Sequence, residues 1–247
     1  MDFINNWAII AYDEVGSTND IARKHTFNSS YPYFVVTARR QTSGRGRRGR
    51  NWISISGNLF MSQCFQLNTQ HLSDAVFLVS LSLQEAIISF APQGKTQLKW
   101  PNDVLIENKK ISGILLEKGE NGYIIAGIGI NVSAAPTNDT NQIYPVASLS
   151  DFGVCTNCQE VLKAYIHAFD KNYALWQRHG FAPIKDKWLK YAKGLFKEIV
   201  VNLEHGQEVG IFAGISDKGA LLLRQGDKIK QILAGDIFYK EENKINE

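Results

Sequence analysis

The first ninety residues carry apolar patterns of two kinds, one with strand spacing and one with helix spacing. Strands are predicted at Trp7–Asp13 and Pro32–Arg40, which are rich in β-branched and aromatic residues. Residues Gly57–Leu67 alternate apolar with polar positions, a pattern typical of a half-buried strand. From Ser73 to about Phe90, apolar residues occupy more than one helix face, which predicts a well-buried helix.

The middle of the chain predicts more strands and then two helices. Asn157–His179 has an apolar stripe at helical spacing and is followed by Gly180, a residue typical of a helix end. A shorter helix is expected in Pro183–Ala192. Four short β runs joined by turns precede these helices: TQLKW, DVLIEN, ISGILLEKG and YIIAGIGINV.

The pattern of apolar and polar residues changes after Gly194. From Phe196 to Tyr239, short apolar runs alternate with turns at the spacing expected of a small β-barrel. We therefore expect two domains, residues 1–195 and residues 196–247. The predicted fold class is α+β, a mixed β-sheet flanked by helices in the first domain and a small all-β module in the second.

Composition limits the functions open to the protein. With 44% hydrophobic residues in 247, the chain has enough apolar matter for a sizeable core, which argues against large-scale disorder. A net charge of only +3 argues against a polycation that coats nucleic acid or a membrane. No signal peptide and no run of about 18 apolar residues is visible, so we expect a soluble cytoplasmic protein without a membrane span.

The three cysteines do not form a disulfide framework, because their number is odd. Cys155 and Cys158 have CxxC spacing, but no second Cys or His pair lies nearby to complete a zinc site. The motif also does not follow a strand into a helix N-terminus of the redox type. Reduced thiols are the expected state.

The most unusual stretch is QTSGRGRRGRNW, Gln41 to Trp52. It places four arginines and three glycines in Gly44–Arg50. Glycine lets backbone N–H groups approach a ligand, and arginine matches phosphate or carboxylate oxygens. Such a loop would order when an anion neutralises its self-repulsion. From spacing alone, three interpretations stay open: a small-anion site, a solvated basic loop, or an RG-type nucleic-acid element.

Two further motifs carry polar groups in a β context. In LKWPND, Pro101 restrains Trp100, and Asp103 is suited to holding Mg²⁺ or to capping a turn. In NKKISGILLE, strand alternation places Lys110 on the face of Ser112 and Ile114. A lysine there would suit a carboxylate ligand, or it would extend its charge to solvent at the sheet edge.

Glycines and short polar residues complete the set of candidates. Gly127 and Gly129 lie in a predicted buried strand, where glycine weakens the sheet unless a flat ligand or a helix needs the space. Ser17, Thr18 and Asn19 stand at a helix start, where capping is the default role and reading a polar heterocycle is the alternative.

Together, and in this order, the motifs resemble those of the biotin protein ligases, also called biotin–[acetyl-CoA-carboxylase] ligases. The motifs are STN, QTSGRGRRGRNW, GNLFMS, KWPND, KKISGILLE, GIGINV and ASL, and they span roughly residues 10–150. The resemblance implies a catalytic fold like that of class II aminoacyl-tRNA synthetases, followed by a small SH3-like β-barrel. It also implies an enzyme that uses Mg·ATP to convert biotin into biotinyl-5′-AMP and then biotinylates a lysine of a carboxyl-carrier domain.

The resemblance implies roles for individual residues as well. Arg47 and Lys110 would be catalytic, and Asp103 would hold Mg²⁺. The residues implied in nucleotide binding are Arg47, Arg50, Trp52, Asn102, Lys110 and Asn131. Those implied in biotin binding are Ser17, Thr18, Asn19, Gln41, Gly44, Arg45, Gly46, Arg47, Lys110, Gly113 and Gly127.

Several expectations follow about partners and competing functions. The first strand begins near Trp7, so we expect the ligase-only type, without an N-terminal DNA-binding domain and without nucleic-acid binding. A carrier domain of a biotin-dependent carboxylase is the expected partner, and a homodimer is compatible with the family. A lipoate or octanoate ligase on the same scaffold, or a nucleic-acid-binding protein using the RG loop, are the alternatives.

Overall fold

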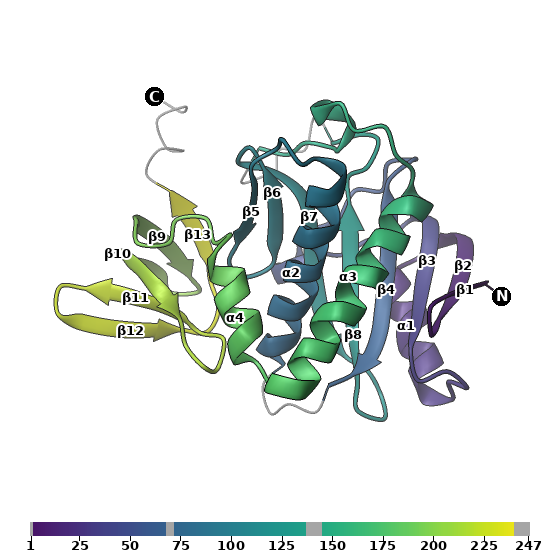
Figure 1. The fold of residues 1–247 in the computed structure, drawn as a ribbon, viewed down its shortest axis with the longest axis horizontal. Helices are drawn as coiled ribbons and strands as arrows, with labels where there is room; N and C mark the ends of the chain where they lie inside the picture. Colours follow the sequence, from purple (N-terminus) through teal and green to yellow (C-terminus); the bar gives the residue numbers. More distant parts are fainter. Residues whose placement is uncertain (1, 68–71, 137–144, 240–247) are drawn as a thin grey trace.

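The computed structural model describes residues 2–67, 72–136 and 145–239 of the chain. In that part of the chain the strands form two sheets, one of eight strands and one of five. Figure 1 shows the large sheet in the centre and the smaller sheet beside it, formed by the C-terminal residues.

The large sheet has the order β1-β2-β3-β4-β8-β7-β6-β5. It is mixed, because β2 and β3 run parallel while the other neighbours are antiparallel. The α+β prediction with a mixed sheet is therefore confirmed. Its strands are β1 (Asp2–Ile4), β2 (Trp7–Val15), β3 (Phe34–Gln41), β4 (Leu59–Gln66), β5 (Thr96–Lys99), β6 (Asp103–Ile106), β7 (Lys109–Lys118) and β8 (Tyr123–Ile130).

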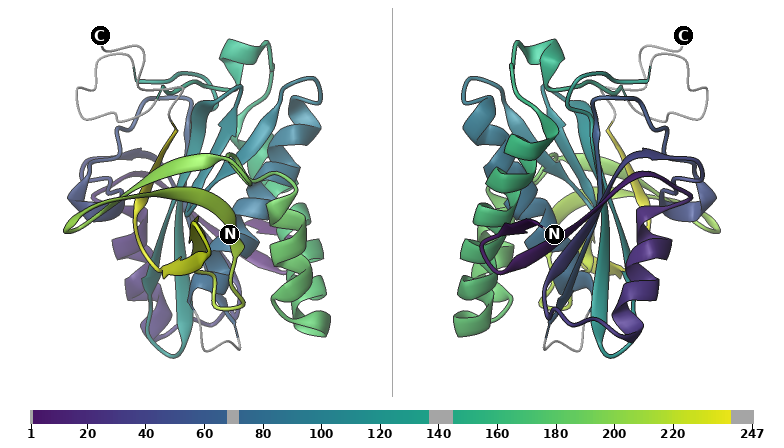
Figure 2. Two further views of the ribbon diagram at one scale, coloured as in Figure 1. Left: turned by 90° about the vertical axis from the view of Figure 1, so that its left-hand side faces the viewer. Right: turned by 90° about the vertical axis from the view of Figure 1, so that its right-hand side faces the viewer.

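Helices cover both faces of this sheet. The short helix α1 (Thr18–Phe27), which makes the parallel crossover from β2 to β3, packs on one face. The other three pack on the opposite face, as the two side views in Figure 2 show. They are α2 (Ser73–Phe90), α3 (Cys158–His179) and α4 (Ala182–Leu189).

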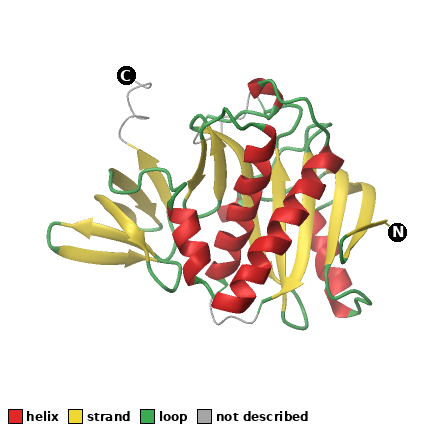
Figure 3. Cartoon of the chain, in the orientation of Figure 1, coloured by secondary structure: helices red, strands yellow, loops and turns green. Residues whose placement is uncertain are grey.

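The main core lies between the sheet and this group of three helices (Figure 3). Aromatic side chains dominate it: Phe169 of α3 stands edge-on to Trp7 and Phe65, and Phe77 of α2 does so to Trp188. Each such pair adds roughly 0.5–1.5 kcal/mol beyond the burial of its apolar area. These contacts fix the sheet as a rigid floor for whatever binds on its other face.

Strand β4 differs from the expectation of a half-buried strand, which was wrong. Its residues are buried on both faces from Leu59 to Phe65, because α1 covers one side while side chains of α3, Tyr165 and Phe169, contact the other. The polar positions that produced the alternation, Ser62 and Gln63, are completely buried and hydrogen-bonded.

Helix α2 is the central core helix, as predicted. Within the described residues it is the one helix with the length and hydropathy of a membrane span, and 72% of that window is buried inside the protein. Core helices of this kind share the composition of membrane spans.

The start of α3 explains both its stability and the CxxC motif. Asn157 caps the helix, because its side chain accepts hydrogen bonds from the backbone N–H groups of Gln159 and Glu160. The Glu160 carboxylate in turn accepts from the backbone N–H of Asn157, which completes a capping box. Cys158 is therefore the first residue of the predicted helix, and a 3₁₀ turn and a loop precede the motif rather than a strand, in agreement with the expectation that CxxC does not follow a strand into a helix N-terminus of the redox type. Burial raises the pKa of the Cys158 thiol, which is opposite to the change that activates redox cysteines.

The second sheet has the order β12-β11-β10-β9-β13 and is entirely antiparallel. The expected closed barrel is not formed by the described residues, whose strands make an open sheet with edges β12 and β13. Its strands are β9 (Glu198–Leu203), β10 (Gly206–Ile215), β11 (Leu221–Gln225), β12 (Lys228–Ile232) and β13 (Asp236–Tyr239). The boundary near residue 195 stays a prediction.

The cap of α3 allows a direct test of this local account. Replacing Asn157 by Ala removes the acceptor for two backbone N–H groups and is expected to cost about 1 kcal/mol of unfolding free energy. At this chain length that lowers the melting temperature by roughly 2–4 °C, measurable by calorimetry. Asn157→Asp, which keeps an acceptor, serves as the control; an equal loss in both variants contradicts the capping role.

Candidate functional site

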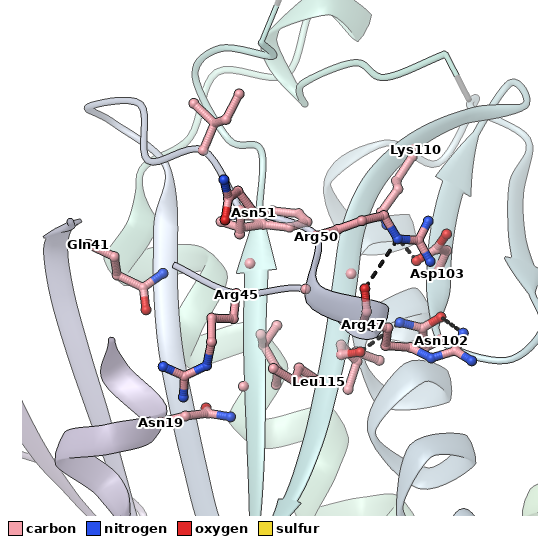
Figure 4. A pocket seen from close by; sticks show the side chains of 18 of the residues that line it. Asn19, Gln41, Arg45, Arg47, Arg50, Asn51, Asn102, Asp103, Lys110 and Leu115 are labelled. Atoms are coloured by element: carbon pink, nitrogen blue, oxygen red, sulfur yellow. Dashed lines mark hydrogen bonds and ion pairs between the residues drawn. The ribbon is translucent and has the colours of Figure 1, made fainter. Parts of the chain in front are cut away.

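A pocket lies on the face of the large sheet that carries α1, beneath the loop between β3 and β4. Figure 4 shows side chains from the start of α1, from this loop, from the beginning of β6 and from strand β7 converging on it, and β8 contributes further lining residues. Its lining residues are Ser17, Thr18, Asn19, Gln41, Arg45, Gly46, Arg47, Arg50, Asn51, Trp52, Ile53, Met61, Asn102, Asp103, Lys110, Gly113, Ile114, Leu115, Gly127, Ile128, Gly129, Asn131, Pro136, Val146 and Asp236.

The floor of the pocket is a patch of sheet without side chains. Gly113 of β7 pairs with Gly129 of β8. A Cβ added to Gly129 would lie 2.2 Å from the Trp52 ring, and one added to Gly127 would lie 2.4 Å from Asn19 Oδ1. Any larger residue would displace these side chains. The glycines thus let Trp52 and Asn19 lie directly on the backbone.

A β-bulge decides which way Lys110 points. The register between β6 and β7 shifts: Val104 pairs with Ser112, but the next residue, Leu105, pairs with Lys110. Strand β7 therefore carries one extra residue between Lys110 and Ser112. Lys110 Nζ consequently lies next to Gly113, 3.1 Å from the Cβ position there. The prediction that Lys110 shares a face with Ser112 and Ile114 was therefore wrong.

Lys110 is the central cation of this end of the pocket. Its Nζ lies 2.7 Å from Asp103 Oδ1 and 5.7 Å from the centre of the Trp52 ring. With both side chains at most 23% exposed, the pair is poorly screened by solvent. The ammonium is thus held at a fixed place, ready for a second anion.

The arginine-rich loop is a compact hairpin. The backbone N–H of Trp52 donates to Gly44 O, and that of Gly46 donates to Arg50 O. Arg45 and Asn51 face each other in an antiparallel backbone β-bridge. At its tip a short 3₁₀ turn, Arg47–Gly49, contains Arg48 at φ 54° and Gly49 at φ 72°. Gly44 does not line the pocket; a Cβ there would lie 2.6 Å from Trp52 O, so its role is to let the two sides of the hairpin approach.

One carboxylate from the second sheet neutralises the tip of this hairpin. Asp236, at the start of β13, lies 3.7 Å from Arg47, 3.1 Å from Arg48 and 3.1 Å from Arg50, with its side chain 13% exposed. Burial lowers the pKa of Arg47, and Asp236 opposes that shift. Asp236 thus supplies part of the neutralising charge from within the chain, and ordering of the loop by a bound anion stays a prediction.

The remaining arginine and Asn102 fix the two sides of the hairpin. Arg45 donates to both carboxylate oxygens of Asp20 on α1, at 2.9 and 2.6 Å, a pairing that lowers the pKa of Asp20. Asn102, next to the cis Trp100–Pro101 peptide bond, accepts from Arg47 and donates to Ile114 O. Both contacts hold the hairpin against the large sheet.

The short polar residues at the start of α1 do not cap the helix. Ser17 is the N-cap residue but its side chain makes no capping bond, so the capping expectation was wrong. Instead, the backbone N–H and hydroxyl of Thr18 donate to Gln41 Oε1 at 2.9 and 3.1 Å. The buried Asn131 donates through Nδ2 to Ala147 O at the far end of the pocket.

The pocket therefore brings together all the predicted site residues except Gly44. Among the residues missed, Asp236 carries the most charge and lies 186 residues from Arg50 in the sequence. No motif near it signals its role, because its partner is a distant loop. Met61 lay within the quoted motif GNLFMS but was not singled out, whereas Gly129 was considered together with Gly127 as leaving room for a flat ligand.

No cluster of three or more His, Cys, Asp or Glu side chains suited to a metal ion occurs among the described residues. The carboxylates that reach the pocket, Asp103 and Asp236, are each paired with cations. A metal that needs several protein ligands does not fit here, whereas one held mainly by substrate phosphates does.

Comparison with known proteins places this pocket in context. Residues 13–133 match the model of the Biotin/lipoate A/B protein ligase family, and residues 194–240 match the Biotin protein ligase C terminal domain. A biotin–[acetyl-CoA-carboxylase] ligase from Paracoccus denitrificans is 34% identical over 214 residues, which cover 83% of this chain and 89% of that protein. The chain belongs to the biotin protein ligase family. A relative from Bacillus subtilis, the bifunctional ligase/repressor BirA, is 34% identical and covers 93% of this chain and 73% of its own length.

Solved structures of biotin protein ligases share the whole fold. The Aquifex aeolicus enzyme in complex with biotin and ATP superposes with a TM-score of 0.80 at 32% identity, covering 94% of this chain and 97% of that one. The Leishmania major enzyme in complex with biotin gives 0.65 at 26% identity, covering 92% and 98%. The resemblance inferred from the motifs is thus confirmed, and the match of residues 194–240 to the family's C-terminal domain is consistent with the expected SH3-like module.

The contact between Asp236 and the hairpin predicts a protease phenotype. Asp236→Asn removes the negative charge shared by three arginines, so the hairpin opens more often and trypsin cuts between residues 45 and 50 several-fold faster. Mass spectrometry of timed digests measures the rate. Asp217→Asn, which loses an exposed ion pair with Lys185 in the same half of the chain, is the matched control; equal cleavage in both variants contradicts the role of Asp236.

Proposed function

We propose that this protein is an ATP-dependent biotin ligase. It activates the carboxylate of biotin as biotinyl-5′-AMP and transfers biotin to a lysine of a biotin carboxyl carrier domain. Relatives named biotin–[acetyl-CoA-carboxylase] ligase and a neighbour solved with biotin and ATP support this assignment.

The observation that carries the proposal is the order of chemistry along one pocket. Polar groups for a heterocycle lie at the α1 end, a side-chain-free floor lies in the middle, and Lys110 and Arg47 stand beyond it. A ligand with a polar ring, a flat body and a terminal carboxylate fits this sequence. A nucleotide would continue past the lysine.

The positive charges of Lys110 and Arg47 suit the step in which the adenylate forms. The biotin carboxylate attacks the α-phosphorus of ATP, a new O–P bond forms, and the bond to pyrophosphate breaks. Two anions must approach each other, so fixed cations are needed on both. Lys110 would hold the carboxylate, and Arg47 would follow the charge that develops on the α-phosphate; Asn102 positions Arg47.

The biotin side of the pocket would hold the ring system. Ser17, Thr18, Asn19 and Gln41 would read the ureido group, with Gly127 and Gly113 leaving room for the bicycle. Arg45 and Gly46 would close the hairpin over it, and Gly44 would let the hairpin close tightly. Excluding water in this way would slow hydrolysis of the adenylate.

The nucleotide side would be formed by Arg50, Trp52 and Asn131, with the indole available for stacking on a base. Mg²⁺ would accompany ATP and neutralise phosphate oxygens. Asp103 fits such an ion, because Mg²⁺ at phosphate sites is typically held by one or two carboxylates together with phosphates and water. Its carboxylate is 11% exposed and adjoins Lys110, at the place where the biotin carboxylate would meet the α-phosphate.

Other features of the assignment are also part of the proposal. The arginines of the hairpin turn toward Asp236, Asn102 and Asp20 rather than forming a solvated basic surface, which supports a ligase without nucleic-acid binding. A homodimer and a cytoplasmic location are proposed as well. The edge strand β1 is a place where a second sheet would add.

An adenylation assay tests the function directly. Incubation with [α-³²P]ATP, Mg²⁺ and biotin is expected to give labelled biotinyl-AMP, because the pocket aligns a carboxylate with two fixed cations. Parallel incubations with lipoate and octanoate test the alternative on the same scaffold. An adenylate formed with lipoate but not with biotin would overturn the proposal.

The role of Lys110 gives a second prediction. Lys110→Ala removes the cation beside the attacking carboxylate and is expected to reduce adenylation by at least about a hundredfold. Lys109→Ala, which removes the exposed neighbouring lysine, is the control and should retain activity. If Lys110→Ala formed adenylate near the wild-type rate, Lys110 would not be the carboxylate-binding group.

A further inference from the structure

Behind the heterocycle end of the pocket lies a serine that does not line it. Ser62 of β4 is completely buried and pairs across the sheet with Gly127 of β8. A serine at this place weakens an otherwise apolar strand unless its hydroxyl is used. Its position below the glycine floor puts that hydroxyl within reach of α1.

The hydroxyl of Ser62 joins two residues at the start of α1. Ser62 Oγ lies 2.6 Å from Asn19 Oδ1 and 2.8 Å from Thr18 Oγ1. Ser62 has one hydroxyl proton, and it goes to Asn19 Oδ1, the nearer atom and one that can only accept. The Thr18 hydroxyl lies between Ser62 Oγ and Gln41 Oε1, and the Thr18 backbone N–H also donates to Gln41 Oε1. Polar contacts thus connect Gln41 at the hairpin base to Asn19, with Ser62 as their buried link.

The amide of Asn19 is oriented by this link. Its oxygen accepts from Ser62 and lies over Gly127, whereas Nδ2 has no hydrogen-bond partner among the described residues. Asn19 is 3% exposed, so the N–H groups of Nδ2 are buried donors. A buried donor without a partner costs free energy until a ligand supplies an acceptor.

We infer that Ser62 is a positioning residue for ligand specificity: by holding the oxygen of Asn19, it fixes the amide so that its N–H groups face a carbonyl-type acceptor of the bound heterocycle. The inference rests on the proposed function, in which the heterocycle is the ureido ring of biotin. That ring offers one carbonyl acceptor and two N–H donors, so a fixed N–H donor at Asn19 matches the carbonyl. Without Ser62, the amide would be free to turn by 180° and present its oxygen instead.

The first test separates binding of the ring from the rest of the reaction. Ser62→Ala is expected to raise the KM for biotin roughly tenfold in the adenylation assay. The KM for ATP should stay within about twofold, since the nucleotide lies beyond Lys110. Ser82→Ala in α2, another completely buried serine with a hydroxyl bonded inside the protein, is the matched control and should change neither KM.

The second test asks whether Ser62 acts through Asn19. On an Asn19→Ala background, adding Ser62→Ala should cost little more in the KM for biotin, because the group being positioned is already gone. Full additivity of the two substitutions would overturn the inference and leave Ser62 with a purely structural role.

The third test uses 2-iminobiotin, in which a proton-bearing nitrogen replaces the ureido oxygen. The wild type should prefer biotin, and Ser62→Ala should reduce this preference several-fold, because a freed amide accepts either ring. Equal losses for both ligands would contradict the inference. If Ser62→Ala does not fold, Ser62→Cys, with a weaker donor of similar shape, is measured instead, and an unchanged preference in that variant counts against it.

Wild-type activity keeps the two proposals apart. Failure of the wild type to form biotinyl-AMP would reject the proposed function itself. A wild type that forms it, together with a Ser62→Ala variant whose KM for biotin is unchanged, would reject only the role of Ser62.

Discussion

The ion pairs between Asp236 and three arginines are the interaction on which the pocket depends. Guanidinium groups so close together repel one another, and the hairpin that carries them lies against a poorly solvated sheet, where an unpaired charge is costly. Asp236 reduces that repulsion without cancelling it, since one carboxylate faces three cations. The residual positive charge makes the pocket attractive to an anionic ligand.

The glycine floor imposes the second constraint, which is geometric. Three glycines on two neighbouring strands leave this patch of sheet without side chains of its own, so that Trp52, Asn19 and Lys110 lie directly on the backbone. The stability lost by placing glycine in strands is offset by the aromatic core on the opposite face, where α2 and α3 cover the same strands. One face of the sheet therefore packs into the rigid aromatic core, and the other face forms the pocket.

Much of this organisation could be predicted from the chain itself. Helices α2 and α3 and strands β5 to β8 lie where periodicity placed them, because long apolar patterns bounded by turns are strong signals. The features that escaped prediction depend on contacts distant in sequence or on single-residue irregularities. The side of the sheet that Lys110 faces depends on a bulge, and a shift of one residue reverses the face of a strand. Likewise, the sequence around Ser62 does not indicate that it bonds to Asn19, 43 residues away, and the sequence around Asp236 does not indicate that it pairs with Arg50, 186 residues away.

The contact between the hairpin and β13 also has a consequence for how this protein changes over generations. Residues 47–50 lie in a loop of the large sheet and residue 236 lies in the smaller sheet, yet Asp236 partly neutralises three of these loop residues. A reversal of charge at either place is tolerated only together with a compensating change at the other. An exchange of the C-terminal sheet between relatives would therefore keep the hairpin neutralised only where the incoming sheet brings an anion to the same position.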